Sequence, residues 1–418
     1  MRRYRWTLAG SLLLALGFAG YLYYGPMALP RQTTQQHQLQ PHQKKLPFPG
    51  KGGRRPILMV QPGVALPVWS ISLAGDDKRL VVASRDRFAH VWDLVEGSEG
   101  PGFENTIGAM GAVALSANGR WLAGADERIV HLWDFAGGEE ANVFKGHDRS
   151  IEALAISAEG SRLATCAKDG VRLWDRSSPE ARHDIRPKDF RIRAVAISAD
   201  GKWFVTGGDD RVAHLWSADT GEEIRRFSGH TDPIRALALS SDGKHLFTAS
   251  DDESACIWDL ASGALIRSFF HDDKVIALAP SKDGKWLATG SEDRLAILWD
   301  IATAEKLQTF RGHTVAVRSA ALTADGRRLF TGGGGEGDAM RLWDTATGKE
   351  LCVVVSFKVQ LAEIERGWAV IDANSNFDCS NHGNAPGLTW VVGSSLFPLA
   401  KLKDNYTPGL LAKHLSAK

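Results

Sequence analysis

The segment IRALALSSDGKHLFTASDDESACIWD, residues 234–259, contains the pattern that decides the fold. Its first six residues alternate as a half-buried β-strand does. Asp242-Gly243 then predicts a tight hairpin turn, because glycine readily adopts a positive φ. A second strand, a Ser-Asp-Asp turn and a third strand ending at Trp258 complete the segment. A fourth strand is expected over residues 265–269.

The same unit recurs through most of the chain. Successive tryptophans that end a unit are 41, 41, 42, 42, 41 and 44 residues apart, and aspartate follows six of the seven. One four-stranded sheet cannot bury both of its faces, whereas several sheets arranged radially can. The sequence therefore predicts an all-β ring of seven blades over residues 56–357. The seven tryptophans are Trp92, Trp133, Trp174, Trp216, Trp258, Trp299 and Trp343.

This pattern resembles the WD-repeat (β-transducin-like) family, which implies a seven-bladed β-propeller. Repeats of that family carry Gly-His before the first strand, Ser or Thr in the second strand, Asp in the following turn, and the tryptophan. By resemblance, three complete sets form hydrogen-bonded tetrads that lock their blades, and a set repeated around a ring does not suit a catalytic triad. Blades 1, 2 and 4 lack a clear histidine and are expected to be less rigid. The three sets are His147, Thr165, Asp169 and Trp174; His230, Thr248, Asp252 and Trp258; and His271, Thr289, Asp293 and Trp299.

The sequence leaves two structural alternatives open. Residues 56–60 and residues 350–355 are equally able to supply the outer strand of the last blade. Cys352 and Cys379 either form a disulfide, as an oxidising compartment would allow, or remain free thiols.

The amino terminus predicts a membrane anchor over residues 1–24, one transmembrane helix. An uncharged run, residues 6–24, would extend about 28 Å as a helix, close to the roughly 30 Å of a hydrocarbon core. Basic residues precede this run, which predicts that the amino terminus stays inside and the ring lies outside. A cleaved signal peptide, with Gly17 and Ala19 before the cleavage site, and a cytosolic orientation are the alternatives. Residues 25–55, rich in Pro and Gln and basic, are interpreted as a linker.

The carboxy-terminal residues 358–418 are expected to form a small α+β tail, with short strands and a helix after Thr407-Pro408. This segment resembles a tail of bacterial proteins that join WD repeats to caspase-like peptidases. The resemblance rests on residues 376–378, 390–393 and 402–415. It implies a bacterial source and, with the anchor, an inner-membrane location with the ring on the periplasmic side. Cys379 precedes His382 by three residues, which is the wrong order and spacing for a caspase dyad.

Charge and composition narrow the function. Fifty basic and 49 acidic residues leave a formal charge of +1, without the basic excess typical of nucleic-acid binding. The sequence shows no Cys-x-x-Cys pair and no clustered metal ligands, so we expect no metal, no cofactor and no small-molecule substrate. The favoured interpretation is a non-catalytic, membrane-anchored scaffold for a protein or peptide partner. A structural subunit of an envelope complex and a propeller enzyme, such as a quinoprotein or hydrolase, are the alternatives.

One face of the ring is the predicted partner-binding site. Mapping of each repeat places several side chains just inside the first strand, and others immediately before the structural aspartate of the next turn. Arginine pairs well with carboxylates, and Arg and Trp are typical interface hot spots. We therefore expect a partner segment with an acidic or carboxylate-bearing core and basic flanks. The alternative is that these are ordinary solvated charges. The first group contains Trp69, Glu152, Arg193, Arg235, Ile276 and Arg318, and the second contains Arg85, Asp209, Asp251 and Glu292.

Overall fold

The computed structural model describes residues 57–60, 67–84, 88–100, 103–104, 110–135, 137–187, 189–335, 338–360, 364–372, 377–379, 388–392, 395–398 and 406–416. The chain divides into two units, Met1–Gly53 and Arg54–Lys418, and all the described strands belong to the second. The expected anchor and most of the linker, residues 1–53, fall in the first unit and lie outside the described residues. No helix in the described part of the chain is long and apolar enough to cross a membrane.

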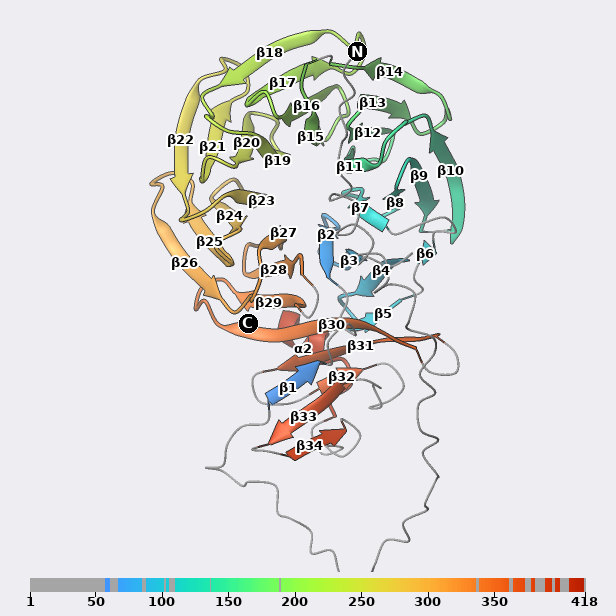
Figure 1. The fold of residues 1–418 in the computed structure, drawn as a ribbon, viewed down its shortest axis with the longest axis vertical. Coiled ribbons are helices and arrows are strands. Elements are labelled where there is room, and N and C mark those ends of the chain that lie inside the picture. Colours follow the sequence, from blue (N-terminus) through green and yellow to red (C-terminus); the bar gives the residue numbers. More distant parts are fainter. Residues whose placement is uncertain are drawn as a thin grey trace, which may run out of the picture. The chain divides into compact units, whose positions relative to one another are not determined.

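Seven antiparallel sheets stand around a ring, which confirms the predicted seven-bladed propeller (Figure 1). In each blade the strands follow one another from the innermost to the outermost in chain order. Blade 1 contains β2 (Val68–Leu73), β3 (Arg79–Ser84), β4 (Phe88–Asp93) and two short outer strands, β5 (Ser98–Glu99) and β6 (Phe103–Glu104). Blade 2 contains β7 (Met110–Leu115), β8 (Trp121–Asp126), β9 (Ile129–Asp134) and β10 (Glu139–Lys145). Blade 3 contains β11 (Ile151–Ile156), β12 (Arg162–Ala167), β13 (Gly170–Asp175) and β14 (Ala181–Ile185).

The remaining blades repeat this order. Blade 4 contains β15 (Ile192–Ile197), β16 (Trp203–Gly208), β17 (Val212–Ser217) and β18 (Glu223–Ser228). Blade 5 contains β19 (Ile234–Leu239), β20 (His245–Ser250), β21 (Ser254–Asp259) and β22 (Leu265–Phe270). Blade 6 contains β23 (Val275–Pro280), β24 (Trp286–Ser291), β25 (Leu295–Asp300) and β26 (Lys306–Arg311). Blade 7 contains β27 (Val317–Leu322), β28 (Arg328–Gly333), β29 (Met340–Asp344), β30 (Glu350–Gln360), β31 (Ile364–Asp372) and β32 (Phe377–Cys379).

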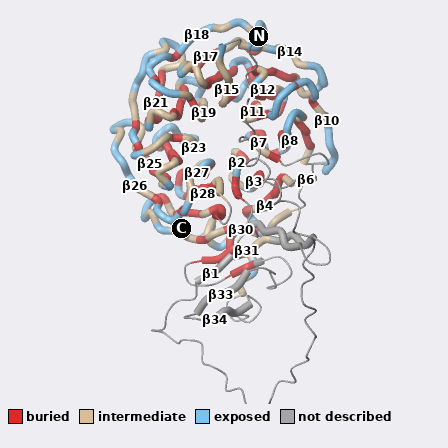
Figure 2. The backbone as a smooth tube through the Cα atoms, in the orientation of Figure 1, coloured by how far each residue is buried: buried red, intermediate tan, exposed pale blue. Residues whose placement is uncertain are grey.

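The two middle strands of each blade are the most buried part of the ring (Figure 2). Every residue of β8 is buried, whereas the outer strand β18 alternates between half-buried and exposed positions before Phe227. This gradient arises because the faces of each blade pack on both neighbouring blades, while the outermost edge meets solvent. The core is therefore a series of clusters between blades.

The hairpin turn of blade 1 departs from the Asp-Gly pattern for a structural reason. Asp77 occupies the position of glycine with a φ of 57°, and its carboxylate accepts a hydrogen bond of 2.7 Å from the backbone N–H of Ala324 in blade 7. Burial, the largest influence, raises the pKa of Asp77. A glycine would adopt this φ more easily but would lose the hydrogen bond that joins the two blades.

The outer strand of blade 7 comes from the carboxy-terminal side, which settles one alternative. Glu350–Gln360 forms β30 and pairs with β29, whereas Ile57–Val60 forms β1 and pairs with β33 (Leu388–Val392). A third strand, β34 (Ser395–Pro398), completes that separate sheet. The blade sheets of the described chain therefore contain no strand exchanged between the two ends, and the ring must be closed mainly by side chains.

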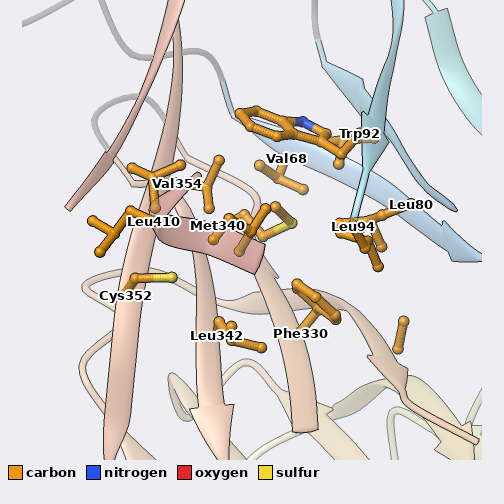
Figure 3. Close-up of a cluster of buried hydrophobic side chains, with 14 residues drawn as sticks. Val68, Leu80, Trp92, Leu94, Phe330, Met340, Leu342, Cys352, Val354 and Leu410 are labelled. Atoms are coloured by element: carbon orange, nitrogen blue, oxygen red, sulfur yellow. The ribbon is translucent and has the colours of Figure 1, made fainter. Parts of the chain in front are cut away.

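A hydrophobic cluster joins blade 1 to blade 7 at this closing seam (Figure 3). Val68 and Trp92 of blade 1 lie with Phe330 and Met340 of blade 7. The short helix α2 (Leu410–Ser416) adds Leu410 and Leu411, which are 1% and 0% exposed. The carboxy-terminal helix is therefore part of the core that closes the ring.

The tail is continuous with the last blade. β30 crosses the expected boundary at residue 357 and pairs with β31, which pairs with β32. The carbonyl of Phe377 accepts a hydrogen bond from Thr407 N–H, and the Asp378 carboxylate accepts one from Gly409 N–H, both of 2.7 Å. Asp378 thus satisfies a free N–H just before α2, as a capping residue does. Cys352 in β30 is buried and is a free thiol, which is the second of the two alternatives that the sequence left open for this residue.

Candidate interaction face

The structure brings each of the three expected tetrads together. In blade 5, His230 Nδ1 is 2.7 Å from Asp252 and His230 Nε2 is 2.6 Å from Thr248 Oγ1. Trp258 Nε1–H donates to the same hydroxyl over 2.9 Å. His147 and His271 make the equivalent contacts in blades 3 and 6. Each tetrad ties the turn between the second and third strands to the body of its blade.

Blade 7 contains a fourth tetrad that the sequence analysis missed. His313 lies 3.0 Å from Asp338 and 2.7 Å from Thr331 Oγ1, which also accepts the Trp343 Nε1–H over 2.7 Å. Asp338 follows the threonine by seven residues, whereas the aspartate of blade 5 follows by four. The longer turn hid the aspartate, although Gly312-His313 was already visible as a family motif.

Blades 1, 2 and 4 contain a buried histidine at a different position. His90, His131 and His214 each lie two residues before the tryptophan of their blade and contact a glutamate of the outer strand through Nδ1. The histidines are 6–7% exposed. In all three blades the glutamate comes seven residues after the tryptophan, so this spacing in the sequence could have indicated the pair of histidine and glutamate. The three glutamates are Glu99, Glu140 and Glu223.

The charge environment differs from one buried histidine to another, including within the tetrads. Burial opposes charge on His230, but its hydrogen bond to Asp252 helps to raise its pKa to about 9. Burial lowers the pKa of His147, and the nearby Arg172 adds to this effect, which together outweigh the attraction of Asp169. Burial also opposes charge on His214, but its hydrogen bonds to Asp210 and Glu223, both of 2.7 Å, prevail and raise its pKa. An imidazole between two carboxylates is stabilised in its charged form.

Most of the predicted partner-binding residues form ion pairs within the ring. We call the end at which the innermost strands begin the front face. Arg193 pairs with Asp209, and Arg235 holds Asp251 through two hydrogen bonds of 2.8 and 2.6 Å. Two further pairs are Glu152 with Arg191 and Glu292 with Lys274. These arginines already have carboxylate partners, so they are less available to a partner protein than the sequence analysis expected.

Two predicted residues remain open on the front face, one on each side of the closing seam. Trp69 is the second residue of β2 and is 45% exposed. Arg318 is the second residue of β27, is exposed, and makes no ion pair or hydrogen bond with any described residue. Because β2 packs beside β27, these positions are neighbours around the channel. Ile276 is half-buried in blade 6, and Arg85 lies outside the described residues.

The described residues contain no group of three His, Cys, Asp or Glu side chains that could hold a metal ion. The fold and its repeated tetrads define a propeller of the WD type. The family model described as "WD domain, G-beta repeat" matches seven segments, which cover more than half of the chain: residues 60–93, 106–134, 138–175, 183–217, 221–259, 263–300 and 304–344. The chain therefore belongs to the WD40 repeat family. No curated protein matches the chain.

Proposed function

We propose that this propeller is a scaffold that binds a protein partner on its front face, next to the closing seam. The observation that carries the proposal is the pair formed by Trp69 and Arg318. Both are exposed, they are neighbours, and Arg318 has no ion-pair partner in the described part of the chain. Trp and Arg are the side chains that most often dominate binding energy.

The partner segment is expected to carry a carboxylate. Arg318 has a planar donor group without a partner among the described residues, and a carboxylate can accept two parallel hydrogen bonds from it. Arg193 and Arg235, in contrast, would have to release Asp209 and Asp251 first. The predicted front-face residues that remain open to a partner therefore lie on blades 7 and 1.

We also propose that residues 1–24 anchor the chain in a bacterial inner membrane and place the propeller on the periplasmic side. The support is the length of the uncharged run, residues 6–24, together with the basic residues before it. Fusion of residues 1–56 to reporter enzymes that are active on only one side of the membrane tests both the span and its direction.

Site-specific photocrosslinking in cells tests the scaffold proposal. A photoreactive amino acid at position 69 should crosslink a partner protein, and the additional change Arg318→Glu should remove that product. The same photoreactive residue at position 95, an exposed apolar residue in the turn after β4, is the matched control. Products of equal yield with and without Arg318→Glu would contradict the proposal.

A further inference from the structure

The opposite end of the ring, which we call the back face, contains the hairpin turns between the first and second strands. There the first residue of the second strand reaches across to the hairpin turn of the next blade. Trp121 packs directly on Gly160, and Trp286 packs directly on Gly326. Arg79 and Arg162 cross the same gap and donate hydrogen bonds of 2.7 Å to the carbonyls of Gly119 and Gly201. Four of the junctions between blades are closed in this way.

The junction between blades 4 and 5 is open. Trp203 occupies the position of Trp121, but it is 40% exposed, whereas Trp121 is 8% exposed. A Cβ atom added to Gly243 would have no other atom within 4 Å. A groove of about 570 Å³ lies between the two blades, and its walls include Trp203, Leu215, Ile224 and Leu260.

Two of the three charged residues that line this groove are basic, Arg225 and Lys244. Arg225 donates a hydrogen bond of 2.9 Å to the carbonyl of Ser262. The ammonium of Lys244 is 4.0 Å from Asp242, and both side chains are more than half exposed, so this pair is weak. The one acidic residue in the lining, Asp259, already accepts hydrogen bonds from Ser262 N–H and its hydroxyl, of 2.7 and 2.5 Å. The groove therefore favours an apolar group next to a carboxylate.

The outer strands of blades 4 and 5 lie beside the groove. β22 contains no acidic residue, and the one acidic residue of β18, Glu223, already pairs with His214 and Arg226. Scattered exposed apolar residues are normal on a protein surface, but a cluster marks an interaction site. Most of the exposed large apolar side chains of the described chain lie on the outer strands of blades 4–6: Ile224, Leu265, Ile266, Phe270 and Leu307.

We propose that the groove between blades 4 and 5 binds a short segment of a second protein that inserts an apolar side chain beside Trp203 and places Asp or Glu near Arg225 and Lys244. A concave site of this volume fits a side chain better than it fits the flat surface of a membrane. The groove lies at the end of the blades opposite the front face, so this inference goes beyond the proposed function and does not depend on it.

Selection from a phage-displayed library of random dodecapeptides tests this proposal. The full-length wild-type chain is the target, and Trp203→Ala serves for counter-selection. The enriched peptides should combine an aromatic or aliphatic residue with Asp or Glu. A synthetic peptide of the enriched sequence should bind Trp203→Ala at least about tenfold more weakly, as is typical when a hot-spot tryptophan is removed.

Three further variants make the result decisive. Trp69→Ala removes a tryptophan of similar exposure from the front face and should leave peptide affinity unchanged. Ile224→Asp keeps Trp203 but adds a negative charge to the groove, so it should also weaken binding. Lys244→Ala should weaken binding and reduce its salt dependence. The proposal is overturned if no peptide distinguishes wild type from Trp203→Ala, if the enriched peptides are basic, or if Trp203 is needed only for binding to vesicles of anionic lipid.

Discussion

The buried histidine is placed in two ways in this ring, one in blades 3, 5, 6 and 7 and the other in blades 1, 2 and 4. In the first group a histidine before the innermost strand binds the threonine and the aspartate of its blade, as His230 does. In the second group the histidine lies on the third strand and binds a glutamate of the fourth, as His214 does. The first arrangement holds the turn between the second and third strands, and the second holds the outer strand. A family motif that is missing from a blade therefore does not mean that its polar contacts are missing.

Blade 1 differs from the tetrad blades in what it leaves unsatisfied. Blade 1 has Val82 where blade 5 has Thr248, so the buried Trp92 Nε1–H has no hydrogen-bond partner. A buried donor without a partner costs about 1–3 kcal/mol. Trp92 instead packs edge-on against Trp368 of β31, with ring centroids 5.1 Å apart. The packing of Trp92 in blade 1 thus depends on the carboxy-terminal segment. In the tetrad blades, the tryptophan N–H is hydrogen-bonded to a threonine of its own blade.

The largest expected effect tests that dependence. Leu411→Ala removes a fully buried side chain of α2 from the closing seam and should lower the free energy of unfolding by about 4 kcal/mol. Chemical denaturation measures the loss. Hydrogen exchange should show faster opening in blade 1 than in blade 5. Lys413→Ala, an exposed position on the same helix, is the control and should change stability by less than about 0.5 kcal/mol. Equal protection loss in blades 1 and 5 would argue against a special role for the seam.

The second largest effect is expected from a substitution that breaks a tetrad. Thr248→Val keeps the shape of the side chain but leaves Trp258 Nε1–H and His230 Nε2 without their shared partner. We expect a loss of about 3 kcal/mol in unfolding free energy, because two buried polar groups become unsatisfied. Urea denaturation followed by circular dichroism gives the value. A loss below about 0.5 kcal/mol would show that the tetrad contributes little.

A smaller effect depends on pH. The unfolded-state pKa of histidine is about 6.5, and His214 has a raised pKa in the folded protein. Its stabilising contribution is therefore complete below about pH 6.5 and is lost as the pH rises through the folded-state pKa. His214→Gln should cost about 2 kcal/mol at low pH and less at high pH, as measured by thermal unfolding across the pH range. His147, with its lowered pKa, predicts the opposite trend for His147→Gln. Parallel pH profiles for the two variants would refute the assignment.

The smallest effect is a gain. Val82→Thr introduces the hydroxyl of the tetrad blades opposite His90, where it can accept the Trp92 Nε1–H. Stability should rise by about 1 kcal/mol, the typical net value of a buried hydrogen bond. Differential scanning calorimetry of the two proteins measures this gain. A destabilised variant would show that the hydrophobic contacts of Val82 matter more than the missing bond.

Much of the fold and part of the site could be predicted from the sequence. The period between tryptophans and the Asp-Gly turns, such as the one at Gly243, predicted seven four-stranded blades because both signals are local. Three tetrads followed from a family motif. The fourth did not, because the turn before Asp338 is longer. On the front face, the positions were predicted but their pairing was not: Arg235 and Asp251 are 16 residues apart and meet only when two strands pair in register.

The sequence by itself determined the number of blades, the positions of their turns and three of the four tryptophan-centred tetrads. These depend on patterns within about forty residues, where strand alternation and turn chemistry act. Only the tertiary structure decided which strand completes blade 7, how α2 closes the ring and why Trp203 stays open while Trp121 is covered. Those outcomes depend on contacts between residues far apart in the chain, because the space at each junction is set by two neighbouring blades together.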